Sequence, residues 1–241
     1  MNNIEECNMG DFLRETNIRL IINVLAHETG HFIANILLND IQPKPKVEDI
    51  VISWDDFYKK PWGRIEYSIK EGVNHWIFPR DEFLCYYTIL SLYSGCIWEK
   101  FANCIFRNLE LSINDIQNCY EGSGFKDAQT VGIINNKYLS LGLTKEFAEK
   151  EIIESYVELL NGLSNEEKQL IYNFFKKISD EIEVCLFDGR EPKEYNLTNE
   201  QLENLKTFIS LNFISVYKEK LTKILDKIST KLKSYIESKS K

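Results

Sequence analysis

The stretch "VLAHETGHFIANILL" (Val24–Leu38) sets the expectation for the fold, because it places two of the chain's three histidines on one strongly apolar segment. Its apolar residues, and those just before it, recur with the 3.6-residue period of a helix: Ile18, Ile21, Ile22, Leu25, Phe32, Ile33, Ile36 and Leu37. Pro43 and Pro45 follow, and proline cannot continue a helix. We therefore predict a buried helix over residues 11–39.

The histidines of this stretch have the spacing of a metal site. His27 and His31 are four residues apart, so a helix presents both imidazoles on one face. Two imidazoles so placed can hold one Zn²⁺ at about 2.0–2.1 Å. Glu28 would then lie beside the ion and accept a proton from a water attacking a carbonyl. The H-E-x-x-H pattern thus predicts zinc ligation by His27 and His31, with Glu28 as general base.

The glycine in this motif also needs a reason. Gly30 in a helix interior costs about 1 kcal/mol relative to alanine. We interpret it as a position where another backbone segment or a substrate passes close to the helix.

The alternative is that His27 and His31 are two core histidines beside a chance glutamate. For this composition, an H-acid-x-x-H pattern is expected by chance in roughly a few chains per thousand. A buried histidine and glutamate would also be costly without a metal or polar partners. The metal site is therefore the favoured interpretation.

The motif supplies two ligands, whereas a catalytic zinc site normally has three protein ligands and one open position. His75, the remaining histidine, is one candidate, although a lone histidine beside Trp76 is typical of a packed loop. The other candidates are carboxylates on later segments, and the residues alone leave the choice open: Glu99, Asp115 and Asp127.

The rest of the chain reads as mainly α with one small β element. Two short runs rich in Val, Ile, Tyr and Trp predict a hairpin or small sheet across residues 47–70. Helices are expected from Pro79 to about Arg107, after a cap at Ser123, over 145–161 after Thr144, over 165–187, and from 199 to the end with a break near Leu211–Ser215. Capping boxes, Ser164 with Glu167 and Thr198 with Gln201, open the last two helices. The segment "FDGREPKEYN" reads as a loop.

Two parts are expected along the chain. Residues 1–140 form the H-E-x-x-H part, and residues 141–241 form a C-terminal helical region. This second part carries no chemical motif, and we expect it to complete the same core or to provide an oligomer or partner surface.

Composition excludes several classes of protein. A net charge of −8 argues against general nucleic-acid binding. The start of the chain lacks a secretory signal, and uninterrupted apolar runs fall short of the roughly 18 residues of a membrane span. The six cysteines include no C-x-x-C pair, so a thiolate zinc site is not expected, and Cys85, Cys96 and Cys104 read as small core residues. We expect a cytoplasmic protein.

The motif and its order of elements resemble the peptidase domain of the FtsH-type AAA+ metalloproteases. "AHETGH" (Ala26–His31) resembles the "HEAGH" helix of that family. In the family a small β element follows, then a helix with a Gly and a Glu in the order that "ILSLYSGCIWEKF" (Ile89–Phe101) repeats. "GSGFKDAQTVGII" (Gly122–Ile134) resembles the acidic turn and helix that come next.

The resemblance implies roles for particular residues. Asp127 aligns with the family's third zinc ligand, so the implied site is His27, His31 and Asp127, with Glu28 as base. Glu99 would support the site or the fold. Lys126 stands where the family has Asn, and the chain has neither a G-x-x-x-x-G-K-[ST] loop nor a predicted membrane anchor.

A second resemblance is fainter. "EKFAN" (Glu99–Asn103) resembles the "ExxAN" helix of short "HELGH" peptidases found beside phage-type repressors. There the glutamate is the third ligand.

The sequence therefore predicts a mainly α, zinc-dependent metallopeptidase that cuts flexible or unfolded polypeptides, alone or fed by a separate partner or in a homo-oligomer. The alternative is a non-catalytic regulatory or binding protein that retains a zinc-stabilised peptidase fold. An exposed strand such as "WGRIEYSI" could position an extended peptide by main-chain pairing, or it could only cover the motif helix.

Overall fold

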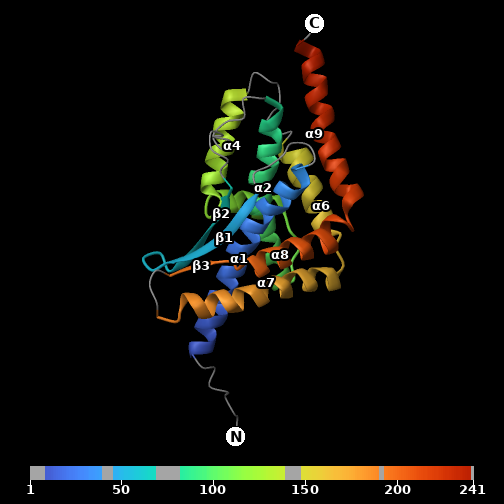
Figure 1. Ribbon diagram of the computed structural model, residues 1–241. Helices are drawn as coiled ribbons and strands as arrows, with labels where there is room; N and C mark the ends of the chain where they lie inside the picture. Colours follow the sequence, from blue (N-terminus) through green and yellow to red (C-terminus); the bar gives the residue numbers. More distant parts are fainter. Residues whose placement is uncertain (1–8, 40–45, 69–81, 139–147, 190–192, 240–241) are drawn as a thin grey trace.

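The computed structural model describes residues 9–39, 46–68, 82–138, 148–189 and 193–239 (Figure 1). Its helices are α1 (Met9–Leu38), α2 (Glu82–Arg107), α3 (Ile113–Tyr120), α4 (Phe125–Tyr138), α6 (Ser155–Asn161), α7 (Asn165–Leu186), α8 (Asn199–Ile209) and α9 (Lys218–Lys239). Two π-helical segments, η2 (Ala148–Glu154) and η3 (Ser210–Ile214), join them. The strands are β1 (Val47–Asp55), β2 (Lys60–Tyr67) and β3 (Glu194–Asn196). The expected mainly α fold with a small sheet is confirmed.

The motif helix α1 runs through the middle of the molecule. Residues 25–30 are all buried, one after another, which occurs only when a helix is covered on every side. Helix α2 packs along it. Helix α7 crosses its N-terminal half, where Arg14 meets Glu183, and β2 lies against its C-terminal half, where Gly63 meets Glu28. Figure 1 shows this arrangement, with α7 and α8 lying across α1 at one end. The all-round burial explains why the sequence around the motif is apolar on both flanks.

By length and composition α1 could also cross a membrane, since Gly10–Leu38 is one long apolar helix. Sixty-one per cent of its most apolar 18-residue stretch is buried against the rest of the protein. The core helix of a soluble protein can have the same length and apolar composition.

The sheet is three-stranded and antiparallel, in the order β2-β1-β3. β1 pairs with β2 from Val47↔Tyr67 to Asp55↔Lys60, with a bulge near Asp49. The third strand was not predicted, because Glu194–Asn196 falls in the segment interpreted as a loop. It pairs with residues 51–53 of β1. A strand of three residues in a segment with Gly and Pro has too weak a β pattern to be recognised from the sequence. It becomes visible only through its pairing with β1.

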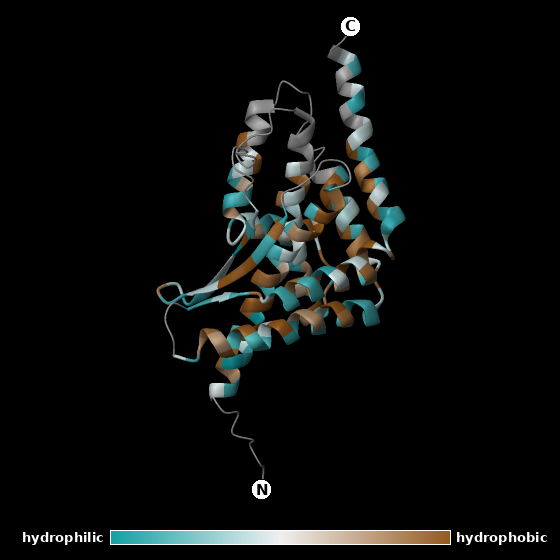
Figure 2. Cartoon of the chain, viewed as in Figure 1, coloured by the Kyte–Doolittle hydropathy of each residue, from teal (hydrophilic) through white to brown (hydrophobic). Residues whose placement is uncertain are grey.

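Both parts of the chain contribute to one hydrophobic core. The indole of Trp98 on α2 packs edge-on against Phe175 of α7, with ring centroids 6.5 Å apart, and against Phe213 of η3, at 4.9 Å. Hydrophobic residues gather where α1, α2, α7 and α8 meet, and polar residues line the outer faces (Figure 2). The C-terminal helices therefore complete the core around the motif helix.

Local signals placed the C-terminal helices correctly. The Ser164 and Thr198 hydroxyls accept hydrogen bonds from the backbone N–H of Glu167 and Gln201, and both capping boxes are formed. The expected break near Leu211–Ser215 is the π-helical segment η3. Thr144 and Pro79 lie outside the described residues.

Candidate metal centre

Two glycines bring α1 and α2 together at the motif. A Cβ on Gly30 would overlap the carbonyl of Ser94 and lie 3.0 Å from the Cα of Gly95. A Cβ on Gly95 would in turn lie 2.6 Å from His31 Nε2 and 2.9 Å from His27 Nε2. The close backbone segment expected at Gly30 is thus α2, and Gly95 leaves the space into which both imidazoles point.

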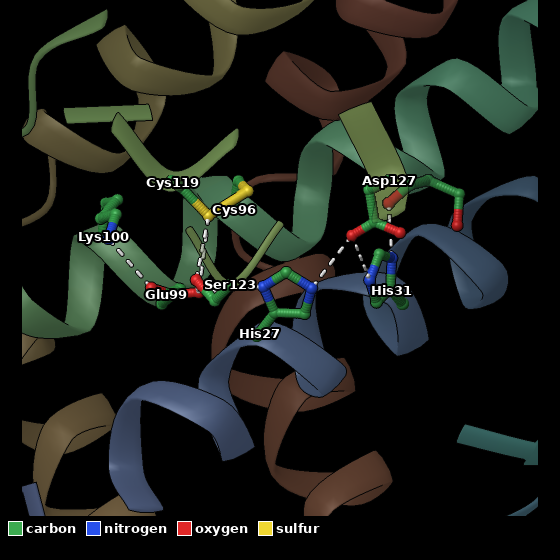
Figure 3. The surroundings of a disulfide bond; sticks show 9 residues. His27, His31, Cys96, Glu99, Lys100, Cys119, Ser123 and Asp127 are labelled. Atoms are coloured by element: carbon green, nitrogen blue, oxygen red, sulfur yellow. Dashed lines mark hydrogen bonds and ion pairs between the residues drawn. A yellow bond between two sulfur atoms is a disulfide. The ribbon is translucent and has the colours of Figure 1, made fainter. Parts of the chain in front are cut away.

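Asp127, on the first turn of α4, contacts both histidines (Figure 3). Its Oδ2 is 3.1 Å from His27 Nε2 and 3.4 Å from His31 Nε2. The imidazole rings meet edge to face, with centroids 4.9 Å apart. The structure therefore brings His27, His31 and Asp127 into one cluster, whose ligand atoms all lie within 4.8 Å of one another.

The other ring nitrogens of the histidines are held by fixed acceptors. His27 Nδ1 donates to Glu99 Oε2 at 3.1 Å, and His31 Nδ1 donates to the carbonyl of Ser91 at 2.8 Å. Both acceptors belong to α2. With Nδ1 of each ring held in this way, Nε2 of each ring points toward Asp127 and is the atom that could bind a metal, the usual orientation of metal-binding histidines.

Glu99 is buried, and its carboxylate oxygens accept several hydrogen bonds. Besides His27, it accepts a hydrogen bond from Ser123 Oγ at 2.6 Å and from Lys100 Nζ at 3.0 Å. Burial alone would raise the pKa of Glu99, but the hydrogen bond from His27, the charge of Lys100 and the hydrogen bond from Ser123 lower its pKa below the usual value. Glu99 is thus an anion that holds the His27 ring in place.

The contacts within the cluster also shift the pKa values of His27 and Asp127. Burial opposes a charge on His27, yet its hydrogen bonds to Asp127 and Glu99 raise its pKa to about 10. Burial would likewise raise the pKa of Asp127, but the hydrogen bonds from His27 and His31 lower it well below its usual range. Two carboxylates therefore converge on one imidazolium, and a cation at this place has to displace that proton.

Glu28 lies under strand β2. It is 7% exposed, and a Cβ on Gly63 of β2 would lie 2.8 Å from its Oε1. Burial raises the pKa of Glu28, while the nearby charges of His31 and His27 lower it in part. Tyr67, at the end of β2, belongs to the same surroundings, since burial and the charges of Glu28 and Asp127 raise its pKa.

The other candidates for a third ligand lie elsewhere or act differently. Asp115 caps α3, where its Oδ2 accepts from the backbone N–H of Ser112 at 2.9 Å. Glu99 contacts the Nδ1 side of His27, away from the cluster that Asp127 completes. His75 lies outside the described residues. Among the three candidates that lie in the described part of the chain, Asp127 is the one that contacts both motif histidines.

Sequence reasoning missed several neighbours of this centre. Ser123 was predicted to cap the next helix, but its hydroxyl donates to Glu99, and the backbone carbonyl of Gly124 accepts the first helical bond, from Ala128. Cys96 was expected to be a plain core residue, but it forms a disulfide with Cys119. These contacts join residues 23 or 24 positions apart, and no local pattern reveals them.

The donor set fits zinc. Ligand atoms at about 2.0–2.1 Å from a tetrahedral ion lie about 3.3 Å from one another. The distances of 3.1 and 3.4 Å from Asp127 to the two Nε2 atoms are close to this value. Two imidazoles and one carboxylate are also a common set for catalytic zinc.

Comparisons with protein-family models, with curated proteins and with solved structures find no match to this chain. What the centre does must therefore be inferred from its own residues.

Proposed function

We propose that this protein is a zinc-dependent metallopeptidase in which His27, His31 and Asp127 hold the ion. The observation that carries the proposal is the convergence of both Nε2 atoms and Asp127 Oδ2 at 3.1 and 3.4 Å, with Glu28 next to His27 on the same helix. Two further observations support the proposal. The Nδ1 atoms of both histidines are held by hydrogen bonds, and the absence of a side chain at Gly95 leaves room beside both Nε2 atoms.

Each residue has a definite task in this reaction. When bound, zinc supplies Lewis acidity toward a carbonyl oxygen and toward water. Glu28 accepts the proton of the attacking water and passes it to the leaving amine. Its raised pKa suits this task, because a base is most effective when its pKa is near the working pH. Glu99 and the Ser91 carbonyl keep the imidazoles oriented throughout.

The substrate class we propose is an extended polypeptide. Among the strands that the structure describes, β2 lies at an edge of the sheet, and its Gly63 lies over Glu28. An extended peptide paired with this edge would run beside the general base. Folded proteins present few such free strands, so flexible or unfolded chains are the expected substrates.

The test is cleavage of an unstructured polypeptide such as casein by the zinc-loaded full chain. Glu28→Gln should lower the rate by about 10²–10⁴-fold, since that is the usual contribution of a general base. Zinc content should not change. The matched control is Glu183→Gln, which alters an equally buried glutamate on α7 and should leave the rate unchanged. Cleavage by Glu28→Gln at the wild-type rate would refute the assigned base.

The second candidate is a non-catalytic binding or regulatory protein with the same zinc site. The burial of Glu28 beneath β2 favours this candidate. A substrate could reach the Glu28 carboxylate only if β2 moved away from α1. This candidate predicts zinc binding without cleavage by the wild-type chain, and a cellular role that Glu28→Gln leaves intact.

A further inference from the structure

A second set of potential metal ligands lies on the other side of His27. The disulfide Cys96–Cys119 joins α2 to α3, and both cysteines are fully buried. Their sulfur atoms and a ring nitrogen of His27 lie within 4.8 Å of one another. Cys119 Sγ is also 3.5 Å from Glu99 Oε2, the oxygen that holds His27 Nδ1 (Figure 3).

We propose that Cys96 and Cys119 are a redox-controlled thiolate site. In the oxidised protein they form the disulfide, and His27 serves the site with His31 and Asp127. In the reduced protein the two thiolates bind a thiolate-binding divalent cation such as Zn²⁺, or Co²⁺ in its place, together with His27. Glu99 is the fourth ligand of this second site.

The chemistry balances with a dithiol as the reductant. Two electrons and two protons pass from the dithiol to the protein disulfide, so the dithiol becomes a cyclic disulfide and the protein gains two thiols. A divalent cation then displaces one proton from each thiol as two metal–sulfur bonds form. A small-molecule disulfide reverses both steps: it takes two electrons from the thiolates and two protons from water, becomes a dithiol, and the cation is released as the Cys96–Cys119 bond forms again.

The arrangement of the donors favours this site. The two Cα atoms are 5.8 Å apart, so both thiols start from the same small space in the core. Two sulfurs, one imidazole nitrogen and one carboxylate oxygen make four ligands, a closed set typical of structural zinc, and thiolates select soft metals. The site with His31 and Asp127 keeps an open position instead. Because both sites need His27, a metal in the thiolate site removes a ligand from the first.

A reductant has a short path to the bridge. The turn of residues 121–123, which connects α3 to α4, is exposed. Ser123 Oγ lies 3.6 Å from Cys119 Sγ, and a Cβ on Gly124 would overlap Cys96 Sγ. Opening of this one turn would uncover the sulfurs, and the same turn leads to Asp127.

This inference shares His27 with the proposed function, and its test does not depend on cleavage. The full chain is prepared in oxidised and in dithiol-reduced form, and a thiol count verifies a difference of two per chain, as one bridge requires. Each form is then titrated with Co²⁺. The reduced form should show a sulfur-to-cobalt charge-transfer band in the near ultraviolet, and the oxidised form should bind Co²⁺ without that band.

Variants separate the two sites. The double variant Cys96→Ser/Cys119→Ser should abolish the band and each single variant should weaken it, whereas Cys104→Ser, which changes a buried free cysteine on the same helix as Cys96, should keep it. His31→Ala should leave the band and weaken Co²⁺ binding by the oxidised form. The proposal is overturned if the reduced wild-type chain binds Co²⁺ without the band, or if Cys96→Ser keeps it at full strength. A missing band together with normal peptide cleavage would refute this inference alone.

Discussion

The motif region and the C-terminal helices bury carboxylates in opposite ways. On α7, Glu183 is 7% exposed and meets Arg14, whose side chain is half exposed, at 3.2 Å. Around His27, by contrast, Glu99 and Asp127 both converge on a single imidazole, with Glu28 close by. One cation beside one anion is an ordinary structural pair. Around His27 two carboxylates share one imidazolium, and a metal cation would take the place of its proton.

The largest effect on folding is expected where the two motif helices touch. Gly30→Ala forces a Cβ into the Ser94 carbonyl of α2, so the backbones must separate. We expect the free energy of unfolding to fall by at least about 2 kcal/mol, as overpacking does. Gly132→Ala on α4 meets nothing within 4 Å and should raise it by about 0.5–1 kcal/mol. Urea denaturation of both variants measures the difference, and equal effects would contradict the packing described here.

The next largest effect is on zinc affinity, and it distinguishes Glu99 from Glu183. Glu99→Gln removes the anion that orients His27 while it preserves the shape of the side chain. Zinc affinity should fall by about 10–100-fold, the usual cost of losing such a partner. Glu183→Gln should not change it. Competition with a chromogenic chelator gives both dissociation constants, and equal affinities would show that Glu99 has no part in the centre.

Stability without metal should depend on pH through His27. Its pKa is raised from 6.5 to about 10, so the folded state favours the protonated form. This contribution is complete below about pH 6.5 and is lost as pH rises toward 10. Thermal unfolding of the metal-free chain should therefore occur at lower temperature as pH rises through this window. His27→Ala should flatten that slope, while zinc affinity of the wild type should increase over the same range.

The smallest effect belongs to the ordinary pair. Arg14→Ala removes a partly exposed partner of Glu183 and should cost about 1 kcal/mol. Lys177→Ala, an exposed position on the same helix as Glu183, should change stability by less than about 0.5 kcal/mol. Neither should alter zinc affinity, and a loss of zinc in Arg14→Ala would mean that the two regions are coupled.

The features that could be predicted from the sequence depend on residues close together in the chain. The period of α1, the capping boxes at Ser164 and Thr198 and the spacing of His27 and His31 all act within a few residues. Asp127 was reached only through a resemblance, because nothing local distinguishes it from Asp115. The partners of Glu99, the bridge from Cys96 and the strand β3 depend on contacts between distant segments. Such contacts are decided by how α2, α3 and α4 pack, which periodicity does not specify.

The identity of the metal ligands is the central claim, and metal content tests it most directly. Elemental analysis should find about one zinc per chain in the oxidised wild type and in Glu28→Gln. Asp127→Ala and His31→Ala, folded by circular dichroism, should each lose most of it. Zinc at the wild-type level and affinity in Asp127→Ala would contradict the claim.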